Sequence, residues 1–94
     1  MIALHLSIHH LKLMTVREKA VAHLLKSPAI EYIRSLEAMT QANPDYVNAN
    51  RVDVGNIVQG FLAGGGFHWD EEIFEKEWPG ILDEALAQVA SKKS

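Results

Sequence analysis

The sequence predicts an all-α domain, or a mainly α domain with one short N-terminal strand, in which about four helices form a compact bundle. Apolar residues recur at helical spacing in four separate segments. Short connections separate these segments, which favours antiparallel packing of neighbouring helices. The chain has 94 residues, of which 48% are hydrophobic and 22% charged, and this balance is typical of one globular domain. We therefore treat residues 1–94 as a single helical domain with a tail at 91–94.

Residues 1–13 are predicted to be a pairing strand or an extension of the domain. Ile2, Leu4, Leu6 and Ile8 alternate with Ala3, His5 and Ser7. Period two is typical of a half-buried strand. Because a single strand is not stable alone, residues 2–9 would need a partner, such as the same strand of a second copy. A helix is the alternative, since Leu4, Ile8 and Leu11 also have helical spacing.

Two helices are predicted between residues 15 and 43. Thr15 and Glu18 have the spacing of a capping box, which starts the first helix. Ser27 is the expected cap of the second helix, with Pro28 at its first position. Asn43 should end the second helix, because the residue before a proline is disfavoured in helical geometry. The expected inward residues are Val16, Ala20, Val21, Leu24 and Leu25 in the first helix, and Ile30, Ile33, Leu36 and Met39 in the second.

The second half of the chain predicts a polar connection at 43–51, a third helix from about Asp53 and a fourth after Asp70. The glycines at 64–66 should end the third helix, because glycine tolerates positive φ. Pro79 falls inside the apolar pattern of the fourth helix, so that helix is expected to kink or break there. The expected inward residues are Val54, Ile57, Val58, Phe61 and Leu62, then Phe74, Trp78, Ile81, Leu82, Ala85, Leu86 and Val89.

The residue patterns point to no catalytic, cofactor-binding or metal-binding site. The chain has no cysteine, which excludes disulfides and thiolate ligands. His5 and His9 share a face but have no third ligand nearby at suitable spacing. The glycines at 64–66 follow a helix and lack the motif of a phosphate-binding loop. We therefore predict that the protein is not an enzyme and carries no cofactor.

Charge is distributed unevenly along the chain and identifies a candidate binding surface. Residues 1–34 carry five basic and two acidic residues, whereas residues 35–94 carry four basic and ten acidic residues. Acidic residues cluster after the glycines, beside tryptophan and phenylalanine, and aromatic residues are enriched at binding hot spots. The candidate partner-binding residues are Phe67, His68, Trp69, Asp70, Glu71, Glu72 and Glu75.

These features favour a small protein–protein interaction module, such as an adaptor, regulator or inhibitor, with a basic protein partner or a second copy of the chain. The alternative is a dimeric DNA-binding regulator, because a strand and two helices over residues 2–41 resemble ribbon-helix-helix proteins. The strand positions Ala3, His5 and Ser7 offer poor base-reading chemistry, which makes nucleic acid the weaker hypothesis. Residues 66–72 are similar to the glycine–aromatic–acidic region of some peptide-modification leader sequences, and we adopt no function from this short stretch.

The expected location is the cytoplasm. The N-terminal apolar segment lacks a basic start and is interrupted by histidines, unlike a signal peptide. No apolar run has the length of a membrane span, so no membrane partner is expected.

Overall fold

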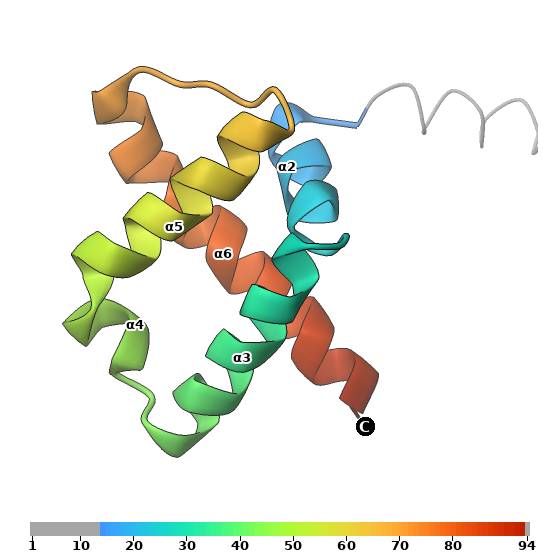
Figure 1. Ribbon diagram of the computed structural model, residues 1–94, viewed down its shortest axis with the longest axis vertical. Coiled ribbons are helices and arrows are strands. Elements are labelled where there is room, and N and C mark those ends of the chain that lie inside the picture. Colours follow the sequence, from blue (N-terminus) through green and yellow to red (C-terminus); the bar gives the residue numbers. More distant parts are fainter. Residues whose placement is uncertain (1–13, 94) are drawn as a thin grey trace, which may run out of the picture.

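The computed structural model describes residues 14–93, which fold into α-helices joined by short connections (Figure 1). The helices are α2 (Val16–Leu24), α3 (Ala29–Ala42), α4 (Tyr46–Ala49), α5 (Arg51–Gly64) and α6 (Glu71–Lys93). Residues 14–93 contain no strand, so the predicted all-α class is confirmed for this part of the chain. The predicted pairing strand at residues 2–9, and the ribbon-helix-helix comparison that depends on it, lie outside the described residues.

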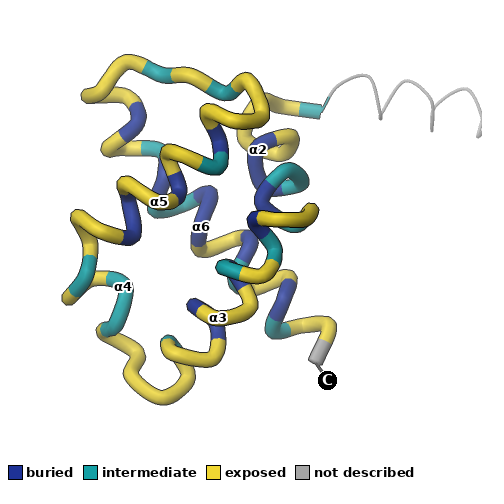
Figure 2. Tube along the Cα trace, in the orientation of Figure 1, coloured by how far each residue is buried: buried dark blue, intermediate teal, exposed yellow. Residues whose placement is uncertain are grey.

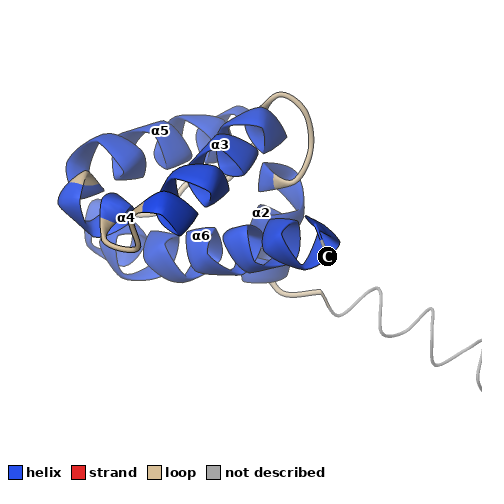
Figure 3. Ribbon diagram, turned by 90° about the horizontal axis from the view of Figure 1, so that it is seen from below, coloured by secondary structure: helices blue, strands red, loops and turns tan. Residues whose placement is uncertain are grey.

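The long helix α6 is the central element of the bundle. It contacts α2, α3 and α5, while α4 contacts α3 and α5. In Figure 3, α6 runs along one side of the molecule, and α3 and α5 lie on the opposite side. Buried positions recur along each long helix (Figure 2), as expected for amphipathic helices around one core. The buried hydrophobic core consists of Ala20, Val21, Leu24, Ala29, Ile33, Leu36, Val54, Val58, Leu62, Phe74, Trp78, Ile81, Leu82, Ala85 and Val89.

The start of α2 has the predicted capping box. The Thr15 hydroxyl accepts a hydrogen bond from the Glu18 amide at 3.1 Å, and the Thr15 amide donates to the Glu18 carboxylate at 3.0 Å. Both bonds satisfy amides that have no partner inside the helix. Val16 follows the cap and is 57% exposed, so its predicted place on the inward face is wrong. The inward face of α2 begins one turn later, at Ala20.

The start of α3 differs from the prediction. Pro28 precedes the helix, Ala29 is its first residue, and no side chain caps it, so the predicted cap by Ser27 is wrong. The backbone makes this turn instead, because the Ile30 amide donates to the Lys26 carbonyl at 2.9 Å.

The inward face of α3 is also rotated from the predicted one. It follows Ile33, Leu36 and Glu37, and Met39 is 41% exposed rather than inward. Glu37 is buried and lines a pocket with residues of α6, whereas Met39 is exposed.

The connection at 43–51 contains the short helix α4, which the prediction missed, and α5 begins at Arg51 rather than Asp53. Tyr46 and Val47 pack partly against the core and hold this turn in place. The Asn50 side chain donates to the Tyr46 carbonyl at 2.9 Å, which joins α4 to α5. The polar composition of this segment predicted a loop. A helix of one turn is too short to show a periodic apolar pattern, and it is ordered by tertiary contacts.

Two further expectations for the second half of the chain need correction. Ile57 was placed in the core but is 42% exposed, because α5 turns Val54, Val58 and Leu62 inward. Of the two alternatives at Pro79, a kink or a break, the break is excluded, because Pro79 lies inside the single helix α6. The missing amide of a proline removes one helical hydrogen bond, and packing of this segment in the core offsets that loss.

Candidate protein-interaction surface

The loop between α5 and α6 begins with a well-defined helix stop. The Phe67 amide donates to the Leu62 carbonyl at 2.9 Å, and the Gly66 amide donates to the Ala63 carbonyl at 3.0 Å. Gly66 has φ +87°, a conformation that favours glycine. These are the bonds of a Schellman motif. The predicted stop at the three glycines is therefore confirmed, and the start of the loop is fixed by hydrogen bonds.

A row of rings, here called the aromatic ladder, supports the rest of this loop. Its members are His23, Phe67, Trp69, Phe74 and Trp78. Successive ring centroids lie 5.8, 6.1, 6.0 and 6.4 Å apart. These separations are within the range in which aromatic pairs attract each other. The ladder runs from α2 through the loop into the buried part of α6, so it ties three segments together.

The predicted binding residues differ in their exposure. Phe67 and Trp69 are half-buried and pack against the core, so they support the surface more than they extend from it. His68 lies between them and is exposed. The other four residues are exposed carboxylates at the start of α6, here called the acidic surface: Asp70, Glu71, Glu72 and Glu75.

Helical periodicity and the position of the helix start together explain why the acidic surface is exposed. Phe74 and Trp78 are four residues apart and both are buried. Glu72 and Glu75 lie off this buried face, whereas Glu71 is three residues before Phe74 and is exposed as the first residue of the helix. Acidic residues in the first turn also interact favourably with the helix dipole, so this end of α6 accommodates negative charge without a bound partner.

Arg51 is a neighbour of the acidic surface that the sequence patterns did not identify. Its guanidinium carbon lies 5.1 Å from the Trp78 ring centroid, which is cation–π geometry. With Glu71, Glu72, Glu75 and Lys76, it lines a shallow groove of about 370 Å³. Arg51 lies far from these residues in the sequence, so only the packing of α5 on α6 reveals the contact.

Gly55 allows α5 to approach α6 closely enough for this contact. A Cβ atom at Gly55 would lie 3.1 Å from Cζ2 of Trp78. At Gly60, in contrast, nothing lies within 4 Å of the same position. The Trp78 indole Nε1 is buried and has no hydrogen-bond partner among the described residues.

The described part of the chain has no grouped metal ligands. Residues 14–93 contain no group of three or more His, Cys, Asp or Glu residues placed to hold a metal ion. His5 and His9 lie outside this range. No helix in the described part of the chain is both long and apolar enough to span a membrane.

Comparisons with models of protein families, with curated proteins and with solved structures find no match to this chain.

Proposed function

We propose that this protein is a small, non-enzymatic protein–protein interaction module that acts as an adaptor, regulator or inhibitor in the cytoplasm. Its acidic surface binds a basic protein partner. The observation that carries this proposal is the exposure of Asp70, Glu71, Glu72 and Glu75 in one turn and a half, on a loop and helix start fixed by the aromatic ladder.

Preorganisation makes this acidic surface suited to recognition. The Schellman motif and the stacked rings hold the loop before a partner arrives, so binding orders few additional groups. Exposed carboxylates that face one direction also attract a basic partner and increase the association rate. The groove beside Arg51 adds a concave region to the charged surface. Ile73, which is 48% exposed, adds apolar area on the same segment.

Charge reversal with a matched control tests the proposal. The test variant carries Glu71→Lys, Glu72→Lys and Glu75→Lys. The control carries Glu31→Lys, Asp45→Lys and Asp83→Lys, which are also exposed and change the net charge by the same amount. Both variants and the unchanged protein are used to capture proteins from a lysate of the source cells, and the captured protein is purified for direct affinity measurement. Circular dichroism confirms that each variant is folded.

We expect a basic protein whose affinity falls by at least roughly tenfold with the test variant and changes little with the control. The affinity of the unchanged protein should also fall as salt is added, because the contact is between exposed charges. Equal loss with both variants would mean that net charge alone matters. Equal retention would mean that the partner binds elsewhere. Either result would contradict the proposal.

A further inference from the structure

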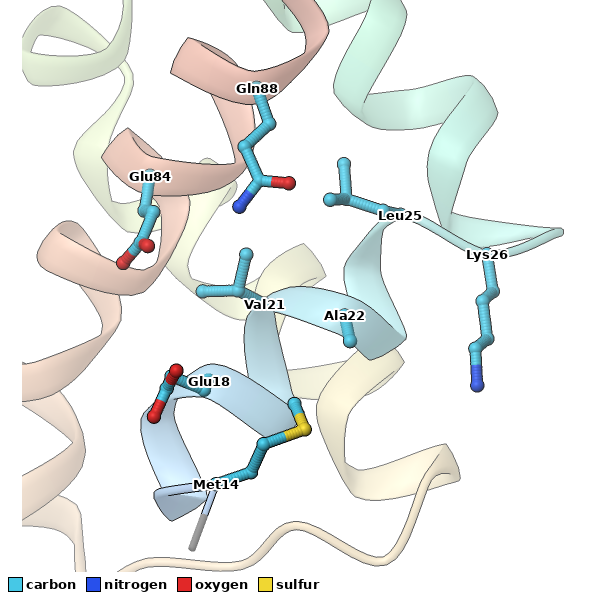
Figure 4. A pocket seen from close by; sticks show the side chains of 8 residues that line it. All are labelled: Met14, Glu18, Val21, Ala22, Leu25, Lys26, Glu84 and Gln88. Carbon is cyan, nitrogen blue, oxygen red and sulfur yellow. The ribbon is translucent and has the colours of Figure 1, made fainter. Parts of the chain in front are cut away.

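A second groove lies between α2 and α6 (Figure 4). None of the residues that line it belongs to the acidic surface. Its volume is about 430 Å³. The residues that line it are Met14, Glu18, Val21, Ala22, Leu25, Lys26, Glu84 and Gln88. In Figure 4, the α2 side chains form one wall, and Glu84 and Gln88 extend from α6 on the other.

The middle of this groove is apolar. Val21 is buried, whereas Ala22 and Leu25 remain half-buried, so apolar surface of α2 is still open to solvent there. These residues and Glu18 recur at spacings of three and four along α2, which places them in one row. The row is the face of α2 that another amphipathic segment would cover.

The position of Met14 indicates which segment that is. Met14 lines one end of the groove, and the chain continues from it through residues 1–13. These residues include Leu4, Ile8 and Leu11, which share one face at helical spacing. From Glu18 to its end at Leu24, α2 rises only about 9 Å, and six helical residues or three extended ones cover that length. Residues 2–11 are therefore long enough to follow the groove in either conformation.

The charges of the segment and the groove also match. Residues 1–13 contain Lys12 and no acidic residue. The end of the groove near Met14 carries Glu18, and Figure 4 shows the Glu84 side chain extending on the same side, with Lys26 at the far end. A segment that turns back at Met14 would hold Lys12 near the two carboxylates and place its apolar face over Ala22 and Leu25.

We propose that residues 2–11 of this chain dock into the groove between α2 and α6 of the same molecule. The direct link through Met14 favours this occupant over a separate partner. A short linker gives an effective concentration on the order of millimolar, so even a weak contact is occupied.

Disulfide trapping tests the proposal in the full chain, because the natural sequence has no cysteine that could interfere. The test variant carries Ile8→Cys and Ala22→Cys, since Ile8 belongs to the apolar set whether the segment is a helix or a strand. The control carries Ile8→Cys and Asn48→Cys. Asn48 is exposed on α4, which lies away from α2 in Figure 1. A disulfide requires the two Cα atoms to approach within about 7 Å.

We expect the test variant to form an intrachain disulfide at least about tenfold faster than the control under mild oxidation. Equal rates in the two variants would overturn the proposal. A disulfide that joins two chains would also overturn it, since the groove would then receive the segment of a second copy. Reduced samples should have the same circular dichroism spectrum, which separates docking from misfolding. The result does not depend on Glu71, Glu72 or Glu75, so it can fail or succeed independently of the proposed function.

Discussion

At the scale of single residues, Trp78 determines how closely α5 approaches α6. Its ring is buried, contacts Gly55 on α5 and lies beneath the guanidinium of Arg51. Its Nε1 atom has no hydrogen-bond partner among residues 14–93, which costs about 1–3 kcal/mol. Dispersion contacts and burial of the large ring outweigh that cost, because a buried aromatic side chain contributes more through its area.

Replacement of two glycines of α5 with alanine, one at a time, tests how tightly Trp78 is packed. Gly60→Ala should raise the free energy of unfolding by about 0.5–1 kcal/mol, because alanine favours a helix and nothing obstructs its methyl group. Gly55→Ala gains the same propensity but places its Cβ 3.1 Å from the Trp78 ring. Overpacking then costs about 1–3 kcal/mol. Urea unfolding should rank Gly55→Ala below the unchanged protein; a variant as stable as Gly60→Ala would contradict the tight packing.

At the scale of elements, the two ends of the loop that leads to α6 are fixed by different interactions. The Schellman motif fixes the first end through backbone hydrogen bonds and the positive φ of Gly66. The aromatic ladder fixes the second end through Trp69 and Phe74. A run of three glycines is by itself conformationally free. The hydrogen bonds and ring contacts give this loop a defined course instead, as the acidic surface requires.

The Gly66 conformation can be tested against its neighbour Gly64. Gly66→Ala should lower the free energy of unfolding by about 1–2 kcal/mol, because an L-residue at positive φ is strained. Gly64 ends α5 with ordinary φ and has free space around it, so Gly64→Ala should leave stability unchanged or raise it slightly. Thermal unfolding of both variants checks this, and equal stabilities would argue against the Schellman motif.

At the scale of the whole molecule, α6 joins all the other long helices into one core. Its inward residues run from Phe74 to Val89, and the helix contacts α2, α3 and α5. A change in any one contact should therefore affect unfolding of the whole bundle, as expected for a small cooperative domain. Tyr32 on α3 provides a probe of this coupling, because its hydroxyl titrates and its ring lies 5.8 Å from that of Phe61 on α5.

Stability should decline in alkaline solution partly through Tyr32. Burial raises the Tyr32 pKa above the ordinary value of 10.0, and nearby Tyr46 and Asp53 add to the effect. The folded protein thus holds this proton more tightly than the unfolded chain. The resulting stabilisation is complete below pH 10 and is lost as pH rises through the folded pKa.

Tyr32→Phe removes that proton while keeping the ring. Urea unfolding from about pH 9 to about pH 11 should show a smaller loss of stability in this variant than in the unchanged protein. Tyr46→Phe is the control for the other tyrosine, and the absorbance of tyrosinate gives the Tyr32 pKa directly. Parallel pH profiles for Tyr32→Phe and the unchanged protein would contradict the raised pKa.

The sequence by itself determined the local features of this protein. The capping box at Thr15 and the stop at Gly66 were predictable, because each depends on residues within a few positions of one another. The helical class and most of the core followed from apolar spacing for the same reason. The exposed acids of α6 could be identified because they lie beside a regular apolar pattern.

Only the tertiary structure decided which faces of these helices meet. It ordered α4, turned Met39 and Ile57 toward solvent, and kept α6 continuous through Pro79. It also brought Arg51 over Trp78 and formed the groove that begins at Met14. These features depend on contacts between residues far apart in the chain. Local spacing gives the period of a helix but not the rotation at which it packs, and that rotation is set by the shapes of all its neighbours together.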